Sequence, residues 1–329
     1  MENTSAPALG AFCLPSEYQQ LIHQSRYARW LDDKRRRETW EETVERYVQF
    51  VIQPVAPEYS DELRDSILRL DVLPSMRAIM TAGPAAERSN IAIFNCAYTP
   101  VEHPKRFHEI LYILMCGTGI GFSVERQDIN RLPLIPKLAS TGPVHTVKDS
   151  KEGWALAFKH TISSLYHGTI PTLDYSKVRP AGARLKTFGG RASGPGPLKN
   201  LIDFTIRTFT EAQGRRLTSI EVHDIVCMTG KAVEVGGVRR SALISLSNLS
   251  DGRMANAKSG SWWESNPQRA GANNSAVYEG TPDVGSFMEE WLTIYRSNSG
   301  ERGIFNREAC RRLCSRIGRD PDHAWGTNP

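Results

Sequence analysis

The opening third of the chain carries apolar residues at three- and four-residue spacing, which is the pattern of amphipathic helices. This spacing predicts three helices, over residues 18–30, 39–53 and 60–71. The apolar face of the second helix is made of Trp40, Val44, Tyr47 and Val48. Thr39 and Glu42 at its start suit a capping box. Residues 1–73 are therefore expected to form an N-terminal helical region.

From Pro74 onward, short apolar runs punctuated by glycine and proline alternate with longer helical patterns. The short runs predict strands over 91–98, 121–125, 132–135 and 242–249. The longer patterns predict helices over 105–116, 151–166, 198–213, 219–235 and 284–297. Such alternation is typical of an α/β layered or barrel domain, which is expected to cover residues 74–329. The polar stretch 252–274, with Trp262 and Trp263, is expected to be a long surface excursion.

Composition and charge fit an ordinary globular protein. Of the 329 residues, 40% are hydrophobic and 23% are charged, and the formal net charge is +5. This charge suits a small anion such as a nucleotide, but it is too diffuse to indicate a nucleic-acid groove. The one dense basic run, residues 34–37, is flanked by acidic residues. We interpret it as a solvated helix start with local ion pairs.

Several other classes of protein are disfavoured. No apolar stretch approaches the ~18 residues that a membrane helix needs, and no secretory signal is visible. Six scattered cysteines do not form a disulfide framework, and they suit a reducing cytoplasm. Cys310 and Cys314 are four residues apart on a predicted helix, but no second Cys or His pair lies near them in sequence. No metal site is therefore expected.

Three glycine-rich runs stand out, over residues 116–122, 189–195 and 236–241. The first lies between a predicted helix and a predicted strand, the reverse of the order in a dinucleotide-binding fingerprint. This order disfavours a nicotinamide dehydrogenase and indicates glycines that let two backbones, or a backbone and a ligand, approach closely. The other two runs carry or follow arginines, which suits either a polyphosphate seat or a tight turn with solvated arginines. Three such loops in one chain favour a nucleotide site.

Nine segments, in this order along the chain, resemble one family. They are 26–30 (RYARW), 95–96 (NC), 117–124 (GTGIGFSV), 149–154 (DSKEGW), 179–184 (RPAGAR), 189–197, 237–242, 273–275 (NNS) and 326–329 (GTNP). The chain resembles the adenosylcobalamin-dependent (class II) ribonucleotide reductases, particularly the monomeric ribonucleoside-triphosphate reductases, from about residue 26 to residue 329. No single motif is needed to establish the resemblance, because the order of all nine matches.

The resemblance implies radical chemistry in a ten-stranded α/β barrel with a finger loop. In the family, cleavage of adenosylcobalamin turns a cysteine at the tip of the finger loop into a thiyl radical, which abstracts the 3′ hydrogen of the ribose. A pair of cysteines then reduces the 2′ carbon and becomes a disulfide. The implied partners are ribonucleoside triphosphates, a deoxynucleotide effector and a thioredoxin-type reductant, in the cytoplasm and without nucleic acid or membrane.

The family's motifs assign roles to residues near both ends of the predicted barrel. Cys96 matches the first cysteine of the reducing pair, although a cysteine after an apolar strand is otherwise interpreted as buried and inert. Asn328 matches the asparagine that binds the ribose hydroxyl, although Thr-Asn-Pro alone indicates only a turn. Ser75, Asn95 and Gly119 fall in segments implied to face the substrate.

The glycine run at 236–241 matches the loop between substrate and allosteric effector. Gly236 and Gly237 would give this loop conformational freedom. Arg239 and Arg240 are the candidates for contacts with a base or with phosphates.

In the family, the thiyl cysteine and a proton-exchanging carboxylate follow the Asn-Pro pair. The resemblance therefore implies an N-terminal portion, inactive alone, whose partner is a C-terminal half that holds most cobalamin contacts. A split gene or an intein is one explanation of the boundary. Two alternatives stay open: a class I large subunit, which uses a metal radical partner, and a non-catalytic nucleotide-binding or regulatory fragment.

Overall fold

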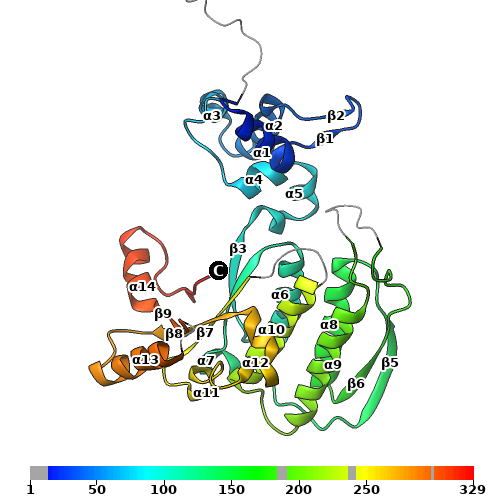
Figure 1. The fold of residues 1–329 in the computed structure, drawn as a ribbon, viewed down its shortest axis with the longest axis vertical. Helices are drawn as coiled ribbons and strands as arrows, with labels where there is room; N and C mark the ends of the chain where they lie inside the picture. Colours follow the sequence, from blue (N-terminus) through cyan, green and yellow to red (C-terminus); the bar gives the residue numbers. More distant parts are fainter. Residues whose placement is uncertain (1–13, 184–190, 236–241, 298–299) are drawn as a thin grey trace, which may run out of the picture. The chain divides into compact units, whose positions relative to one another are not determined.

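The computed structural model describes residues 14–183, 191–235, 242–297 and 300–329 (Figure 1). Contacts between residues divide the chain into two units, Met1–Asn95 and Cys96–Pro329. None of the helices within the described ranges combines the length and the apolar character needed to cross a bilayer.

The first unit is built from short helices and turns. In chain order they are α1 (Glu17–Ile22), η1 (His23–Tyr27), β1 (Trp30–Leu31), β2 (Arg36–Arg37), α2 (Trp40–Tyr47), η2 (Val48–Ile52), η3 (Pro57–Tyr59), α3 (Ser60–Leu68), α4 (Met76–Thr81), α5 (Pro84–Arg88) and η4 (Asn90–Ile93). Their apolar faces meet in one core, formed by Leu14, Trp40, Val44, Val48, Ile52, Ile67 and Ile79. Thr39 and Glu42 form the capping box that the sequence predicts at the start of α2.

Arg46 on α2 ties the segment after residue 73 to this unit. Its guanidinium group donates hydrogen bonds to the main-chain oxygens of Ile79 and Ala82, both at 3.0 Å. The same group pairs with the buried carboxylate of Glu38 at 2.8 Å. The structure therefore divides after residue 95, whereas the sequence pattern placed the change at residue 73.

The second unit alternates strands and helices. In chain order they are β3 (Cys96–Pro100), α6 (Lys105–Met115), β4 (Gly119–Ser123), α7 (Arg126–Ile129), β5 (Ser140–Thr146), α8 (Lys151–Tyr166), β6 (Thr169–Asp174), α9 (Gly196–Glu211), α10 (Ser219–Val235), β7 (Leu243–Asn248), α11 (Gly252–Ala255), α12 (Trp262–Ser265), η5 (Pro267–Gly271), β8 (Asn273–Tyr278), α13 (Val284–Ser297), β9 (Gly303–Asn306) and α14 (Arg307–Arg316).

Five strands of this unit form one parallel sheet in the order β3-β4-β7-β8-β9. Strands β5 and β6 form a separate parallel pair beside α8 and α9 (Figure 1). Parallel neighbours require crossover connections, and helices supply most of them here. The α/β class predicted from the sequence is therefore confirmed. Within the described residues the main sheet has two edges, β3 and β9.

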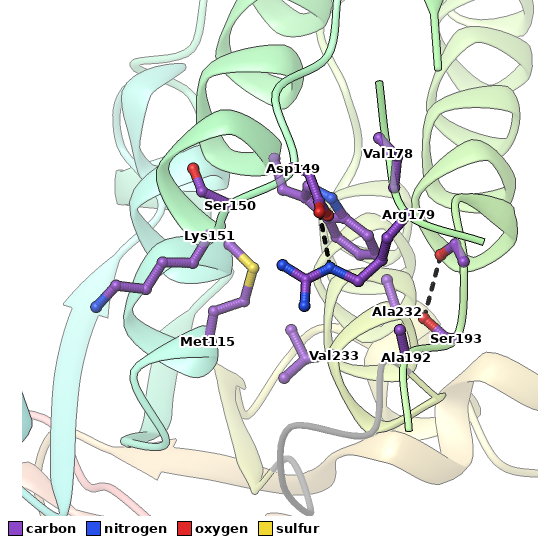
Figure 2. Close-up of a pocket in the computed structure, with 12 residues that line it drawn as sticks. Met115, Asp149, Ser150, Lys151, Val178, Arg179, Ala192, Ser193, Ala232 and Val233 are labelled. Carbon is purple, nitrogen blue, oxygen red and sulfur yellow. Dashed lines mark hydrogen bonds and ion pairs between the residues drawn. The ribbon is translucent and has the colours of Figure 1, made fainter. Parts of the chain in front are cut away.

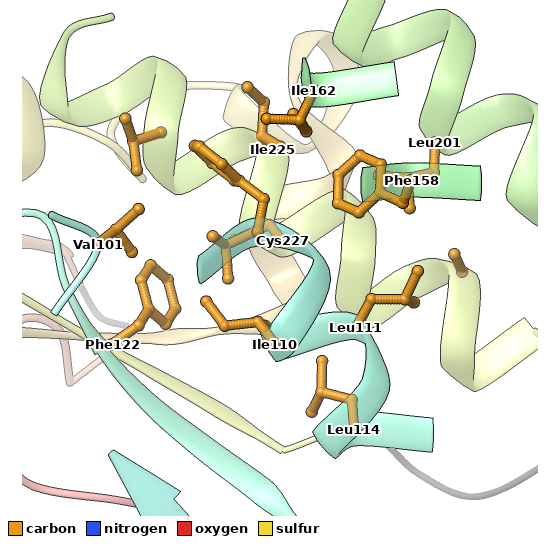
Figure 3. Packing of buried hydrophobic residues seen from close by; sticks show 14 of the residues in the cluster. Val101, Ile110, Leu111, Leu114, Phe122, Phe158, Ile162, Leu201, Ile225 and Cys227 are labelled. Atoms are coloured by element: carbon orange, nitrogen blue, oxygen red, sulfur yellow. The ribbon is translucent and has the colours of Figure 1, made fainter. Parts of the chain in front are cut away.

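A single apolar core lies between the main sheet and its helices. Figure 3 shows part of it, including Val101, Ile110, Leu111, Leu114, Phe122, Phe158, Ile162, Leu201, Ile225 and Cys227. On β4, Ile120 and Phe122 point into this core and are fully buried. Successive side chains of a strand point to opposite faces, so Gly119 and Gly121 lie on the other face of the sheet.

Several sequence predictions of local structure are wrong. The predicted strand 91–98 is correct only from Cys96, where β3 begins, because its apolar start forms the turn η4 and leaves Phe94 exposed. Residues 132–135 form no regular element, since their pairing is confined to two main-chain bonds between Ile135 and residues 214–215. The first predicted helix breaks into α1 and a π-helical turn.

Two interpretations of polar stretches also need correction. The basic run 34–37 lies in the β1–β2 hairpin instead of a helix start, although Lys34 and Arg36 do pair with Glu42 as expected of local ion pairs. The stretch 252–274 is more than a surface excursion, because α11, α12 and η5 order it and Met254 is buried.

Candidate functional site

Residues 326–329 run across the face of the sheet that is opposite the helices. A side chain at Gly121 would overlap the Thr327 carbonyl group, and one at Gly326 would overlap the ring of Tyr98. A Cβ at Gly119 would lie 2.9 Å from the ring of Pro329. The glycines of the 116–122 run thus let two backbones approach closely, as the sequence indicates.

Cys96 lies at one end of this contact. It is the first residue of β3 and pairs in register with Gly119, so both residues share the face that residues 326–329 cross. Its thiol donates a hydrogen bond to the main-chain oxygen of Pro329, with Sγ and O 3.1 Å apart. The sequence placed Cys96 after an apolar strand; the structure places it at the start of one, partly exposed and without a disulfide.

The other predicted residues divide into three groups. Asn328 is exposed and its Cα lies next to Gly121, so the structure brings Cys96, Gly119 and Asn328 together. Ser75 and Asn95 are exposed residues of the first unit. The predicted effector loop, with Gly236, Gly237, Arg239 and Arg240, lies outside the described residues.

Arg307 is a site residue that the sequence did not reveal. It begins α14 directly after β9, and its Nη2 lies 2.5 Å from Oε2 of Glu125, which follows β4. Its Nη1 contacts Glu279, and its Nε donates to the main-chain oxygen of Trp325 at 2.9 Å. Burial acts to lower the pKa of Arg307, but Glu125 and Glu279 outweigh it and raise the pKa above its usual value. The guanidinium group of Arg307 therefore stays charged in the interior.

Tyr98 supports the same segment from β3. Burial raises the pKa of its phenol well above the usual value, so the ring stays neutral against Gly326. The sequence did contain a signal for this end of the site, because Glu125 is a carboxylate that follows a buried strand. Functional groups often lie at the ends of the strands of a parallel sheet.

A pocket of about 140 Å³ lies at the N-terminal end of α8 (Figure 2). Asp149, Lys151 and Arg179 line it, and Ser193 and Val233 close its other side. Within it, Arg179 Nε lies 2.7 Å from Asp149 Oδ2. An arginine paired with a carboxylate in a partly apolar hollow suits a small polar ligand, whereas the Lys151 ammonium extends away from Arg179 (Figure 2).

The first turn of α8 is built to hold this pocket. Ser150 caps the helix by accepting a hydrogen bond from the Gly153 N–H at 3.0 Å. Lys151 reaches Cys116, with Nζ and Sγ 3.2 Å apart, and lies over the ring of Tyr112. The 149–154 motif therefore fixes a charged helix start beside the pocket.

Comparison with known proteins agrees with these features. Residues 136–207 match the family model described as the insertion domain of B12-dependent ribonucleotide reductase. An adenosylcobalamin-dependent ribonucleoside-triphosphate reductase of Lactobacillus gasseri is 26% identical over 88% of this chain and 48% of its own length. The reductase of the same name from Lacticaseibacillus paracasei is 29% identical over 94% of this chain and 51% of its own length.

A crystal structure of a B12-dependent (class II) ribonucleotide reductase has the same fold over most of this chain. It superposes with a TM-score of 0.71 and 24% sequence identity, covering 87% of this chain and 49% of that chain. The resemblance indicated by the sequence motifs is thereby confirmed. The chain spans about half the length of the curated relatives it matches.

Proposed function

We propose that this chain forms part of an adenosylcobalamin-dependent ribonucleoside-triphosphate reductase, which converts ribonucleoside triphosphates to deoxyribonucleotides in the cytoplasm. The observation that carries the proposal is the meeting of Cys96, Gly119 and residues 326–329 on one face of a parallel sheet. These are positions at which the chain carries the family's motifs. A thioredoxin-type reductant and the rest of the barrel are partners in the same proposal.

The residues of this chain have separate tasks in the proposed reaction. Cys96 supplies one thiol of the pair that reduces the ribose, and its sulfur is oxidised to a disulfide as the 2′ carbon is reduced. Asn328, whose side chain is exposed, hydrogen-bonds a ribose hydroxyl and so fixes the sugar over the thiol. Gly119 keeps the strand backbone accessible to the sugar or to residues 326–329.

When bound, adenosylcobalamin would supply the radical. Four cavities of the described residues have volumes of about 140, 830, 640 and 580 Å³. None of these four is lined by Cys96 or by residues 326–329. We therefore assign none of these four cavities to the cofactor.

The pocket at the start of α8 is the proposed seat of part of a deoxynucleotide effector. Its volume of about 140 Å³ is below the ~300–1,000 Å³ typical of whole small-molecule sites, so it suits one group of the nucleotide. Arg179 can bind phosphate oxygens, and Asp149 can accept from a ribose hydroxyl. The sequence continues from this pocket into the loop with Arg239 and Arg240.

Calorimetric titration with each deoxynucleoside triphosphate tests the effector pocket. Replacing Arg179 by Ala should weaken binding about tenfold or more, since a hydrogen bond to a charged group contributes ~1.5–3 kcal/mol. The matched control is Arg207→Ala, because Arg207 lies over the Phe204 ring on α9 and does not line the pocket. Equal affinity of the parent and both variants would place the effector elsewhere.

The reductase proposal is tested by deoxynucleotide formation from each ribonucleoside triphosphate in the active enzyme that carries this chain. Activity should require adenosylcobalamin and a dithiol reductant. Turnover that depends on a dimetal subunit and not on cobalamin would show a class I enzyme. Effector binding without any turnover under all these conditions would favour a regulatory protein.

A further inference from the structure

We infer that Arg307 is a positioning residue, which holds residues 325–329 across the sheet so that their main chain meets Cys96. The inference rests on the proposed function, in which Cys96 and Asn328 serve one reaction. It concerns how this site is assembled and involves no change in its chemistry.

The contacts of Arg307 reach both the sheet and the segment. The carboxylate of Glu125, which follows β4, accepts a hydrogen bond from each terminal nitrogen of the guanidinium group. Nη2 lies 2.5 Å from Oε2, and Nη1 lies 2.9 Å from Oε1. The remaining nitrogen, Nε, donates to the main-chain oxygen of Trp325. One rigid planar group thus joins the end of a strand to the residue that precedes Gly326.

The two sides of this link are themselves fixed. Glu125 is fully buried and also accepts hydrogen bonds from Ser123 Oγ at 2.9 Å and from Gln127 Nε2 at 2.8 Å. On the other side, the indole of Trp325 donates to the Asp320 main-chain oxygen at 2.7 Å and packs edge-on against His323. Residues 320–325 therefore form a local turn, and the hydrogen bond from Arg307 to Trp325 docks this turn on the sheet.

The path of the segment shows what this docking controls. After Trp325, Gly326 packs against the ring of Tyr98. Thr327 then lies against Gly121, and Pro329 lies against Gly119. Asn328 and Pro329 are exposed at the end of this path. Release at Trp325 would therefore free the part of the segment that covers the Cys96 thiol.

The competing interpretation is that Arg307 only stabilises the fold. The chain contains a second buried arginine–glutamate ion pair that serves as a control for this interpretation. Arg302 and Glu290 are also buried and lie 2.7 Å apart, but Arg302 donates to residues 247–249 and not to the 320–329 segment. Loss of either arginine leaves a buried carboxylate unpaired and lowers stability. Only loss of Arg307 should change the environment of Cys96.

The test is the alkylation rate of Cys96 by N-ethylmaleimide, followed by peptide mass spectrometry, in the parent, Arg307→Gln and Arg302→Gln. Arg307→Gln should speed alkylation of Cys96 about tenfold, as expected for the loss of one hydrogen bond from a charged donor. Cys116 is the internal reference, and its rate should stay the same. Arg302→Gln should leave both rates unchanged.

Arg307→Lys is the second variant, used alone if Arg307→Gln does not fold. A lysine keeps the charge beside Glu125 but lacks the planar fork, so Cys96 should react faster than in the parent and more slowly than in Arg307→Gln. In the active reductase, kcat should fall across the same series.

Two results would overturn the inference. One is an unchanged Cys96 rate in both Arg307 variants, and the other is equal acceleration in Arg302→Gln, which would show general loosening. The alkylation rate does not depend on turnover. A failed reductase assay with the expected alkylation pattern would therefore count against the proposed function alone.

Discussion

Gly121 and Thr327 approach each other so closely that a methyl group at residue 121 would overlap the Thr327 carbonyl group. A glycine-rich run in a nucleotide enzyme is usually interpreted as a phosphate loop. Here Gly121 makes room for the protein's own main chain instead. The site therefore depends on a steric fit that any side chain larger than hydrogen disturbs.

We predict that Gly121→Ala displaces residues 326–329 and lowers the free energy of unfolding of the second unit by about 1–3 kcal/mol, the usual cost of overpacking. Thermal unfolding and hydrogen exchange of the 320–329 peptide measure both effects. The control is Gly196→Ala, because a Cβ at Gly196 meets no atom within 4 Å. Unchanged exchange of the peptide in Gly121→Ala would contradict the fit.

Replacement of Cys96 by Ser should abolish multiple turnover in the active reductase, since the hydroxyl cannot form the disulfide that reduces the 2′ carbon. Cys227→Ser is the matched control, because Cys227 is fully buried in the core on α10. It should retain most activity after allowance for stability. Near-normal turnover of Cys96→Ser would reject the assigned role.

The first unit should lose stability at acid pH through Glu38. Burial acts to raise the pKa of Glu38, but Arg46 and the Arg29 N–H outweigh it and hold the pKa below its ordinary value of 4.5. The pair therefore stabilises the folded state above pH 4.5, and this contribution is lost as the pH falls through the lowered pKa.

Glu38→Gln should remove this pH dependence and cost about 3–5 kcal/mol at neutral pH, because Arg46 is left without its buried partner. Denaturant unfolding between pH 2 and pH 7, monitored by hydrogen exchange of α2, gives both quantities. Glu41→Gln is the control, because Glu41 is a nearby carboxylate in the first turn of α2. A parent that keeps its full stability below pH 3 would refute the role of the pair.

Effector identity should control substrate choice through Arg239 and Arg240. Such coupling typically amounts to about 1–3 kcal/mol, or roughly 5- to 150-fold in relative preference. Reduction of each ribonucleotide with each deoxynucleotide effector, in the parent and in Arg239→Ala and Arg240→Ala, measures it. If both variants keep the parent's effector-dependent preferences, the loop is only a turn.

The sequence predicts the longer helices well because their signals are local. The bounds of α8, α10 and α13 agree with the periodic patterns, and Thr39 with Glu42 caps α2 as expected. The α/β class follows from the same alternation. Each of these features depends on residues only three or four positions apart.

The errors arise where distant contacts decide the local structure. An apolar run such as 91–94 resembles a strand, but without a paired neighbour it forms a turn and leaves Phe94 exposed. Arg307 and Glu125 are 182 positions apart, so no spacing rule connects them. The motifs located Cys96, Gly119 and Asn328 separately, and only the sheet register and the path of residues 326–329 show that they meet.

The contact between Cys96 and Pro329 joins residues 233 positions apart. A ribosome adds about 5–20 residues per second, so roughly 10–50 s separate the synthesis of Cys96 from the synthesis of residues 326–329, which lie over its thiol. During that interval the nascent Cys96 is open to oxidation or alkylation, while the first unit is already complete in sequence. Pulse labelling of stalled nascent chains with a thiol reagent should therefore detect Cys96 strongly before residue 329 emerges and weakly afterwards.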